Sequence, residues 1–189
     1  MILADDEALV QAAREGDPSS FNQLVERYQT SLYNLVLRHV ADRQLAEDVT
    51  QEAFLSAWRA LASYKGGSFR AWLFRIAINE ARDLHRRVNR RPATSLDNMI
   101  EEGTIGGHEA DLERGPEDQA LSSATLRAIE NCIRRLPDDQ RVVLLMCDVE
   151  DLRYDEAAEA LGLPLGTVKS RLFRARAAMR KLLIESGEL

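Results

Sequence analysis

The chain has few of the residues that build metal centres or disulfides. Its 189 residues include two cysteines, Cys132 and Cys147, and three histidines, His39, His85 and His108. The histidines are scattered, and each cysteine lies among apolar neighbours in a separate expected helix, so we expect buried, reduced thiols. The sequence therefore predicts neither a metal site nor a disulfide.

Long apolar runs are also missing. No stretch approaches the roughly 20 apolar residues that span a bilayer, and the start, MILADDEALV, has no basic leader before a long apolar run. We therefore expect a cytoplasmic protein without membrane insertion. The apolar–polar alternation of β-strands is absent too, whereas apolar residues recur at helical spacings, which predicts an all-α protein.

Signatures of catalysis are lacking as well. The sequence shows no nucleophile with an adjacent base, no cluster of metal ligands and no glycine-rich loop that would cradle phosphates. We therefore expect neither an enzyme nor a bound cofactor.

The most informative stretch present is YDEAAEALGLPLGTVKSRLFRARAAMRKLL, residues 154–183. It predicts a short amphipathic helix that ends at Gly162 and a second helix that Pro164 opens. The second helix has a buried stripe at spacings of three and four, and its other face is basic, without a carboxylate before Glu185. This pattern favours a DNA-binding helix-turn-helix over a solvated hairpin whose arginines only keep it soluble.

The position of each basic residue along the second helix predicts its role. The start of this helix would enter the major groove, where arginine can form two hydrogen bonds with guanine. We expect groove contacts from Lys169, Ser170, Arg171 and Arg174 and phosphate contacts from Arg176, Arg180 and Lys181.

The net charge of −6 disfavours DNA binding when the chain is taken as a whole, but the charge is unevenly distributed along it. Residues 69–91 carry seven arginines against two carboxylates, whereas residues 92–125 carry eight carboxylates against one arginine. We expect two small helical domains, 1–91 and 121–189, joined by a flexible acidic linker, 92–120. This linker is either a solvating spacer or a strand that occupies a groove shaped for nucleic acid.

The basic helix of the first domain follows a polar loop, residues 64–68, whose Ser68 can cap it. On its outer face Arg75, Asn79, Arg82 and Arg86 align at spacings of four, three and four, which suits contacts with DNA. Trp72 lies just beside the buried stripe, where it either packs in the core or offers its ring to an unstacked base.

The preceding helix, LAEDVTQEAFLSAWRAL, residues 45–61, has two distinct faces. Small and branched apolar residues at spacings of four form its buried face. An acidic and partly apolar stripe forms the other face, with Asp48, Gln51, Glu52, Leu55 and Arg59. Spacing alone is compatible with a solvated face or with a partner surface.

Three segments in this order carry a family resemblance: AEDVTQEAFLSAWRAL, SFRAWLFRIAINEARDLHRR and, beyond the acidic linker, LPDDQRVVLLMCDVEDLRYDEAAEALGLPLGTVKSRLFRARAAMRKLL. Together they resemble the extracytoplasmic-function (ECF) sigma factors of bacterial RNA polymerase, in domain order and over nearly the whole chain. The resemblance implies a non-enzymatic factor that binds core RNA polymerase and directs promoter-specific initiation. A stand-alone helix-turn-helix regulator is the alternative, but it leaves the basic and acidic helices of the first domain unexplained.

The resemblance also implies site residues. For docking on the clamp helices of the polymerase β′ subunit, they are Asp48, Gln51, Glu52, Phe54 and Leu55. For the minus-ten element and its unpaired base, they are Tyr64, Lys65, Ser68, Phe69, Trp72, Arg75, Asn79, Arg82 and Arg86. For the minus-thirty-five element, they are Lys169, Ser170, Arg171, Phe173, Arg174 and Arg176. Further implied partners are the polymerase β flap and the anti-sigma factor that many relatives have.

Overall fold

A computed structural model describes residues 5–90 and 116–187. Within these ranges the chain forms eight α-helices, one 3₁₀ turn and one π-helical turn, and no strand. The all-α prediction is therefore confirmed. Most of the predicted linker, 92–120, lies outside the described residues. Its last part is helical, because a helix begins at Pro116.

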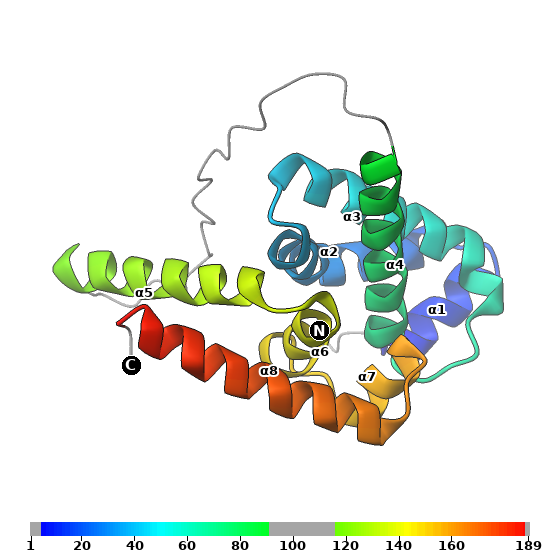
Figure 1. Cartoon of the computed structure of the whole chain (residues 1–189). Coiled ribbons are helices and arrows are strands. Elements are labelled where there is room, and N and C mark those ends of the chain that lie inside the picture. The colour runs from blue at the N-terminus through cyan, green and yellow to red at the C-terminus, as the bar shows by residue number, and fades with distance from the viewer. Residues whose placement is uncertain (1–4, 91–115, 188–189) are drawn as a thin grey trace.

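The helices fall into two groups along the chain (Figure 1). The N-terminal half contains α1 (Asp6–Arg14), α2 (Pro18–Val40), α3 (Arg43–Ala60), η1 (Leu61–Ser63) and α4 (Phe69–Arg90). The C-terminal half contains α5 (Pro116–Arg135), α6 (Asp138–Leu144), η2 (Leu145–Val149), α7 (Tyr154–Leu161) and α8 (Leu165–Glu185).

Local chemistry sets the helix ends. The Asp42 carboxylate accepts a hydrogen bond from the Leu45 backbone N–H at 2.8 Å and so caps α3. Gly162, with φ of 63°, ends α7 in the left-handed conformation that turns the chain into α8. Each amphipathic helix then buries its apolar stripe. Leu35, Leu73 and Phe74 are fully buried in the N-terminal half, and Val143 and Val168 in the C-terminal half.

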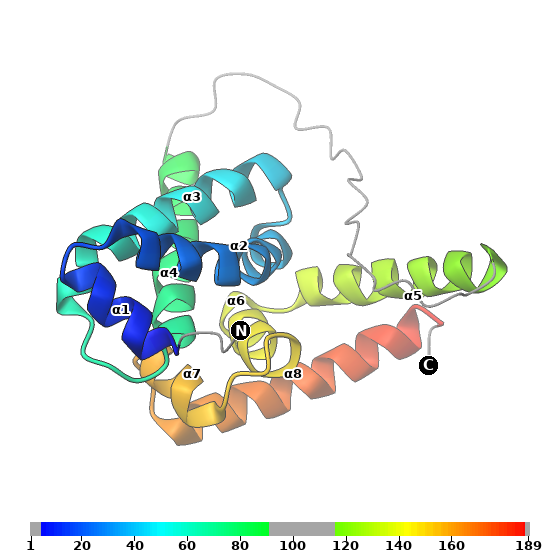
Figure 2. The ribbon, with the colours of Figure 1, turned by 180° about the vertical axis from the view of Figure 1, so that it is seen from behind.

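The two halves pack against each other. Helix α4 contacts α7, and α2 contacts α5 and η2. Both views of the ribbon show α7 at the end of α4, and α5 beside α8 (Figures 1 and 2). Arg70 of α4 pairs with Glu150 at 2.6 Å, and Arg82 of α4 pairs with Asp138 of α6 at 3.0 Å. In this structure, then, the predicted DNA-binding face of α4 partly faces the C-terminal half.

Candidate nucleic-acid interface

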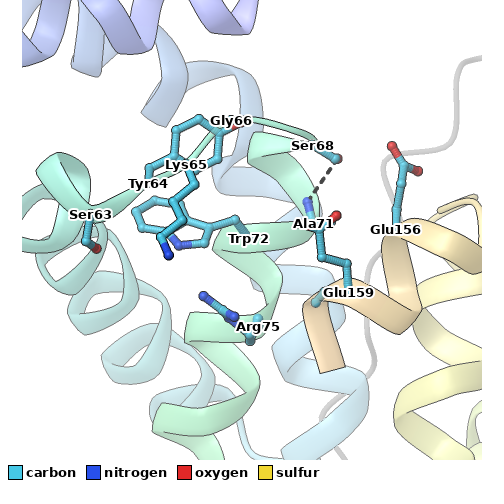
Figure 3. Close-up of a pocket in the computed structure, with 11 residues that line it drawn as sticks. Ser63, Tyr64, Lys65, Gly66, Ser68, Ala71, Trp72, Arg75, Glu156 and Glu159 are labelled. Carbon is cyan, nitrogen blue, oxygen red and sulfur yellow. Dashed lines mark hydrogen bonds between the residues drawn. The ribbon is translucent and has the colours of Figure 1, made fainter. Parts of the chain in front are cut away.

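A pocket of about 300 Å³ lies where the loop of residues 64–68 meets α4 (Figure 3). Predicted minus-ten residues line one side of it: Tyr64, Lys65, Ser68, Trp72 and Arg75. Glu156 and Glu159 of α7 line the other side. The structure thus brings together residues that the sequence places eleven positions apart, and adds two carboxylates that sequence reasoning missed.

Aromatic packing and hydrogen bonds shape this pocket. The ring of Tyr64 packs on Phe69 and Trp72 with centroids 5.9 and 5.2 Å away, and burial raises its phenol pKa. The Tyr64 hydroxyl donates to the Gly67 carbonyl at 2.6 Å. Ser68 caps α4 as predicted, because its Oγ accepts from the Ala71 N–H at 3.2 Å. Phe69 is only 1% exposed, so it supports the pocket from within the core.

The outer face of α4 is only partly free. Arg75, Asn79 and Arg86 are exposed, although Arg86 also pairs with Asp83 at 3.3 Å. Arg82 is half-buried and donates from Nε and Nη2 to Asp138 Oδ2 at 3.2 and 3.0 Å. While the two halves pack against each other, which we call the closed arrangement, the Asp138 carboxylate therefore occupies the guanidinium of Arg82, a predicted DNA contact.

The acidic stripe of α3 faces solvent. Asp48, Gln51 and Glu52 are exposed, and Leu55 keeps 49% of its surface open. Phe54, in contrast, is 9% exposed and packs in the core, so its part in the predicted docking surface is to hold α3 in place.

Trp58 extends this stripe and was missed by sequence reasoning. It is 41% exposed, and its ring lies edge-on to Phe21 with centroids 4.9 Å apart. Its position three residues after Leu55, on the same helical face, is the signal that could have found it.

The helix-turn-helix of α7 and α8 exposes the aromatic side chain of Phe173 among cationic side chains. Lys169, Phe173 and Arg174 are exposed, and Phe173 keeps 75% of its surface open. Arg171 is only 28% exposed at its side chain and pairs with Asp139 of α6 at 3.2 Å. Ser170 Oγ donates back to the Thr167 carbonyl at 3.0 Å.

Arg176 links the elements of the helix-turn-helix. Its Nε and Nη2 donate to the two oxygens of Asp148 at 2.8 and 2.6 Å, and Nη2 also reaches the Tyr154 hydroxyl at 3.2 Å. These hydrogen bonds raise the pKa of Arg176 above its ordinary value. Here the predicted phosphate contact ties α8 to η2 and α7.

The described part of the chain also bears on metal binding and on membrane crossing. There, His, Cys, Asp and Glu residues form no group of three or more that could hold a metal ion. No helix among the described residues is long and apolar enough to cross a membrane. Cys132 and Cys147 are both free and buried.

Two family descriptions match the sequence. Residues 24–91 match "Sigma-70 region 2", and residues 126–179 match "Sigma-70, region 4". The first match covers α4 and the acidic stripe, and the second covers the helix-turn-helix.

Curated relatives match nearly the whole chain. It is 38% identical over 174 residues to the ECF RNA polymerase sigma-E factor of Haemophilus influenzae, covering 90% of this chain and 91% of that protein. It is 39% identical over 180 residues to the RNA polymerase sigma-H factor of Pseudomonas aeruginosa, with 94% and 93% covered.

Solved structures show the same fold. CnrH, solved in complex with the cytosolic domain of CnrY, matches with a TM-score of 0.70 and 28% identity, covering 95% of this chain and 97% of that one. The sigma factor RpoE of Bartonella quintana, solved with the anti-sigma factor NepR, matches with a TM-score of 0.64 and 25% identity, with 86% and 96% covered.

Proposed function

The chain belongs to the sigma-70 family and, within it, to the ECF RNA polymerase sigma factors, and on that premise we propose which of its surfaces carry each step of initiation. The protein is a promoter-directing sigma factor and not a stand-alone regulator. Sigma factors are initiation factors, and this chain would lend DNA specificity to the polymerase without catalysing a reaction, inside the cell where the polymerase works.

The observation that carries the assignment is the placement of two basic helices on separate halves. Helix α4 belongs to the part that matches region 2, and α8 to the part that matches region 4. Residues 1–91 would dock on polymerase and recognise the minus-ten element, and residues 121–189 would recognise the minus-thirty-five element. Residues 92–120 would link them, so the spacing of the halves on polymerase would set the permitted promoter spacing.

Docking on core polymerase would use the exposed stripe of α3. Exposed carboxylates around a half-exposed leucine and tryptophan combine charge complementarity with an apolar anchor, as protein interfaces commonly do. Asp48, Gln51, Glu52, Leu55 and Trp58 form this surface. Its partner would be the β′ clamp helices, and the region 4 half would contact the β flap.

Capture of an unpaired base would use the pocket beside Trp72. Flipping a base out of a duplex costs a few kcal/mol of lost stacking, and base–aromatic stacking returns about 1 to 3 kcal/mol. Trp72 would supply aromatic surface, with the buried Tyr64 packed against it, and Lys65 and Arg75 would supply positive charge for the strand. Asn79 and Arg86 would extend the contact along α4, with Arg82 once it leaves Asp138.

Recognition of the upstream element would use the exposed start of α8. Phe173 and Arg174 are exposed. Arg174 would form two hydrogen bonds with guanine, and Phe173 would contact thymine methyl groups. Lys169 would pair with phosphate or with a base acceptor, whereas Ser170, Arg171 and Arg176 would reach DNA only after giving up their present partners.

An inhibitory partner is part of the proposal. The Bartonella quintana relative was solved with an anti-sigma factor. By similarity, such a protein would block initiation here by covering the α3 stripe and the basic helices.

Promoter binding with and without core polymerase tests this assignment. A labelled promoter duplex would be titrated with the free chain, with core enzyme and with the reconstituted holoenzyme. We expect tight, sequence-dependent binding only from the holoenzyme. Equally tight binding by the free chain, or no promoter preference in the holoenzyme, would overturn the proposal.

A further inference from the structure

Arg14, the last residue of α1, reaches across to the segment that precedes the pocket loop. Its Nε donates to the Leu61 carbonyl at 3.1 Å. Its Nη2 donates to the carbonyls of Ala62 and Tyr64 at 2.8 and 2.7 Å. Arg14 lies ten residues before the region 2 match begins, so neither the motif nor the match points to it.

All three acceptors are carbonyls at the C-terminal end of a helix, and that of Leu61 also accepts from the Tyr64 backbone N–H at 3.2 Å. At the C-terminal end of a helix the last carbonyls have no partner within the helix, and the helix dipole favours a cation there. Leu61 and Ala62 belong to η1, which ends α3, and Tyr64 follows directly. Because the guanidinium is a planar fork, three simultaneous bonds fix the direction in which the chain leaves η1.

That direction decides where the pocket wall lies. Tyr64 is held at its backbone carbonyl by Arg14, and its hydroxyl holds the Gly67 carbonyl at 2.6 Å. Between the two fixed carbonyls, those of Tyr64 and Gly67, the backbone passes through Gly66 and Gly67 with φ of 92° and 90°. A segment with two such glycines has wide conformational freedom, so its shape depends on how its ends are fixed.

We propose that Arg14 is a positioning residue for base capture: it shapes the loop of residues 64–68, so that an unpaired nucleobase fits beside Trp72, without touching DNA. The inference rests on the proposed base capture. Arg14 is not among the residues that line the pocket, whereas Tyr64, Lys65, Trp72 and Arg75 are.

The test uses holoenzyme reconstituted with wild type, Arg14→Ala or Arg14→Lys. Its probes are single-stranded oligonucleotides with the minus-ten element, either intact or lacking one base at a time, and a duplex with only the upstream element. We expect Arg14→Ala to weaken binding of the intact strand about tenfold, as loss of charge-assisted hydrogen bonds would. The penalty for removing the captured base should shrink, while penalties at other positions and binding of the upstream duplex stay unchanged.

Arg14→Lys keeps the charge but loses the fork, so we expect an intermediate effect, about threefold. It also serves as the test should Arg14→Ala fail to fold. Arg135→Ala is the matched control, because it removes an exposed arginine from the other half and should change none of these probes.

An undiminished base penalty in the Arg14 variants would overturn the inference, as would an equal loss on every probe, which marks a merely structural role. Should the wild type show no base-sensitive position at all, the proposed base capture itself would fail, and this assignment with it.

Discussion

Adjacent residues on α8 face opposite surroundings. Leu172 is 2% exposed in the core, and Phe173 is 75% exposed between Arg171 and Arg174. An aromatic ring exposed to water contributes little to the stability of the fold, so we expect Phe173 to serve in contact with a partner.

Replacement of these two neighbours separates stability from DNA recognition. Phe173→Ala should change the free energy of unfolding by less than about 0.5 kcal/mol, since little buried surface is lost. It should weaken upstream-element binding by the holoenzyme by about 1 to 3 kcal/mol. Leu172→Ala should instead cost about 2 to 5 kcal/mol of stability, because it leaves a cavity. Chemical denaturation and DNA titration measure both effects, and a destabilised Phe173→Ala would contradict this division.

Cys147 gives the fold a dependence on alkaline pH. Burial raises the pKa of its thiol from the ordinary 9.0 to about 11, and Asp148 acts in the same direction. Because the pKa is higher in the folded chain than in the unfolded chain, the thiol's contribution is complete below pH 9 and is lost as the pH rises to about 11.

We expect this group to remove about 2 kcal/mol of unfolding free energy across that window. Denaturation measured at several pH values should show a flatter profile for Cys147→Ala, whatever packing it loses at neutral pH. An identical alkaline slope in wild type and variant would assign the loss to other groups, such as the tyrosines.

Roles that depend on distant partners could not be predicted at this scale. Helical spacing placed Arg171 and Arg176 on the basic face of α8, but their partners Asp139 and Asp148 are 32 and 28 residues earlier in the chain. Periodicity describes one helix and carries no information about which carboxylate of another helix will meet it. Glu156 and Glu159 at the pocket escaped prediction for the same reason.

At the scale of elements, pattern was a reliable guide. The stripes at spacings of three and four, the cap at Ser68 and the turn at Gly162 all correspond to observed features. The start of α5 was missed: helix begins at Pro116, whereas the sequence suggested a linker to residue 120. The acidic, glycine-containing stretch before Pro116 masked this start, although proline fits the first turn of a helix.

The exposed stripe of α3 allows a test of polymerase docking. Asp48→Arg combined with Glu52→Arg reverses two exposed charges, so it should weaken association with core polymerase at least tenfold while the fold stays intact. Competition for core enzyme measures the affinity, and circular dichroism checks the fold.

The matched control reverses the exposed carboxylates of Glu15, directly after α1, and of Glu26 in α2, as Glu15→Arg with Glu26→Arg, with the same change in net charge. It should leave core binding unchanged. Equal weakening by both pairs would show that only net charge matters and would reject α3 as the docking surface.

At the scale of the whole molecule, the C-terminal half covers part of the proposed DNA-binding surface of α4. Glu156 and Glu159 line the pocket, Asp138 holds Arg82, and Arg70 pairs with Glu150, which is 7% exposed. Burial raises the pKa of Glu150, and the hydrogen bond from Arg70 opposes this shift. Promoter DNA would have to compete with this arrangement for the same side chains.

Weakening the contact between the halves should therefore favour binding of DNA. Asp138→Asn with Glu150→Gln removes both carboxylate charges, and we expect the free chain to expand in small-angle scattering and to bind a minus-ten single strand about tenfold more tightly. Glu52→Gln with Asp155→Asn breaks one ion pair within each half, removes the same number of charges and is the control. Weaker strand binding by the first pair, or an equal gain by the control, would contradict the competition.

The most direct measurement is run-off transcription by purified core polymerase on a library of promoter sequences, with and without this chain. The account predicts transcripts only when the chain is present, from templates that share two short elements at one spacing. Loss of the minus-ten element, or of the minus-thirty-five element, should abolish that selection. A library on which the chain confers no initiation above core enzyme alone would contradict the account.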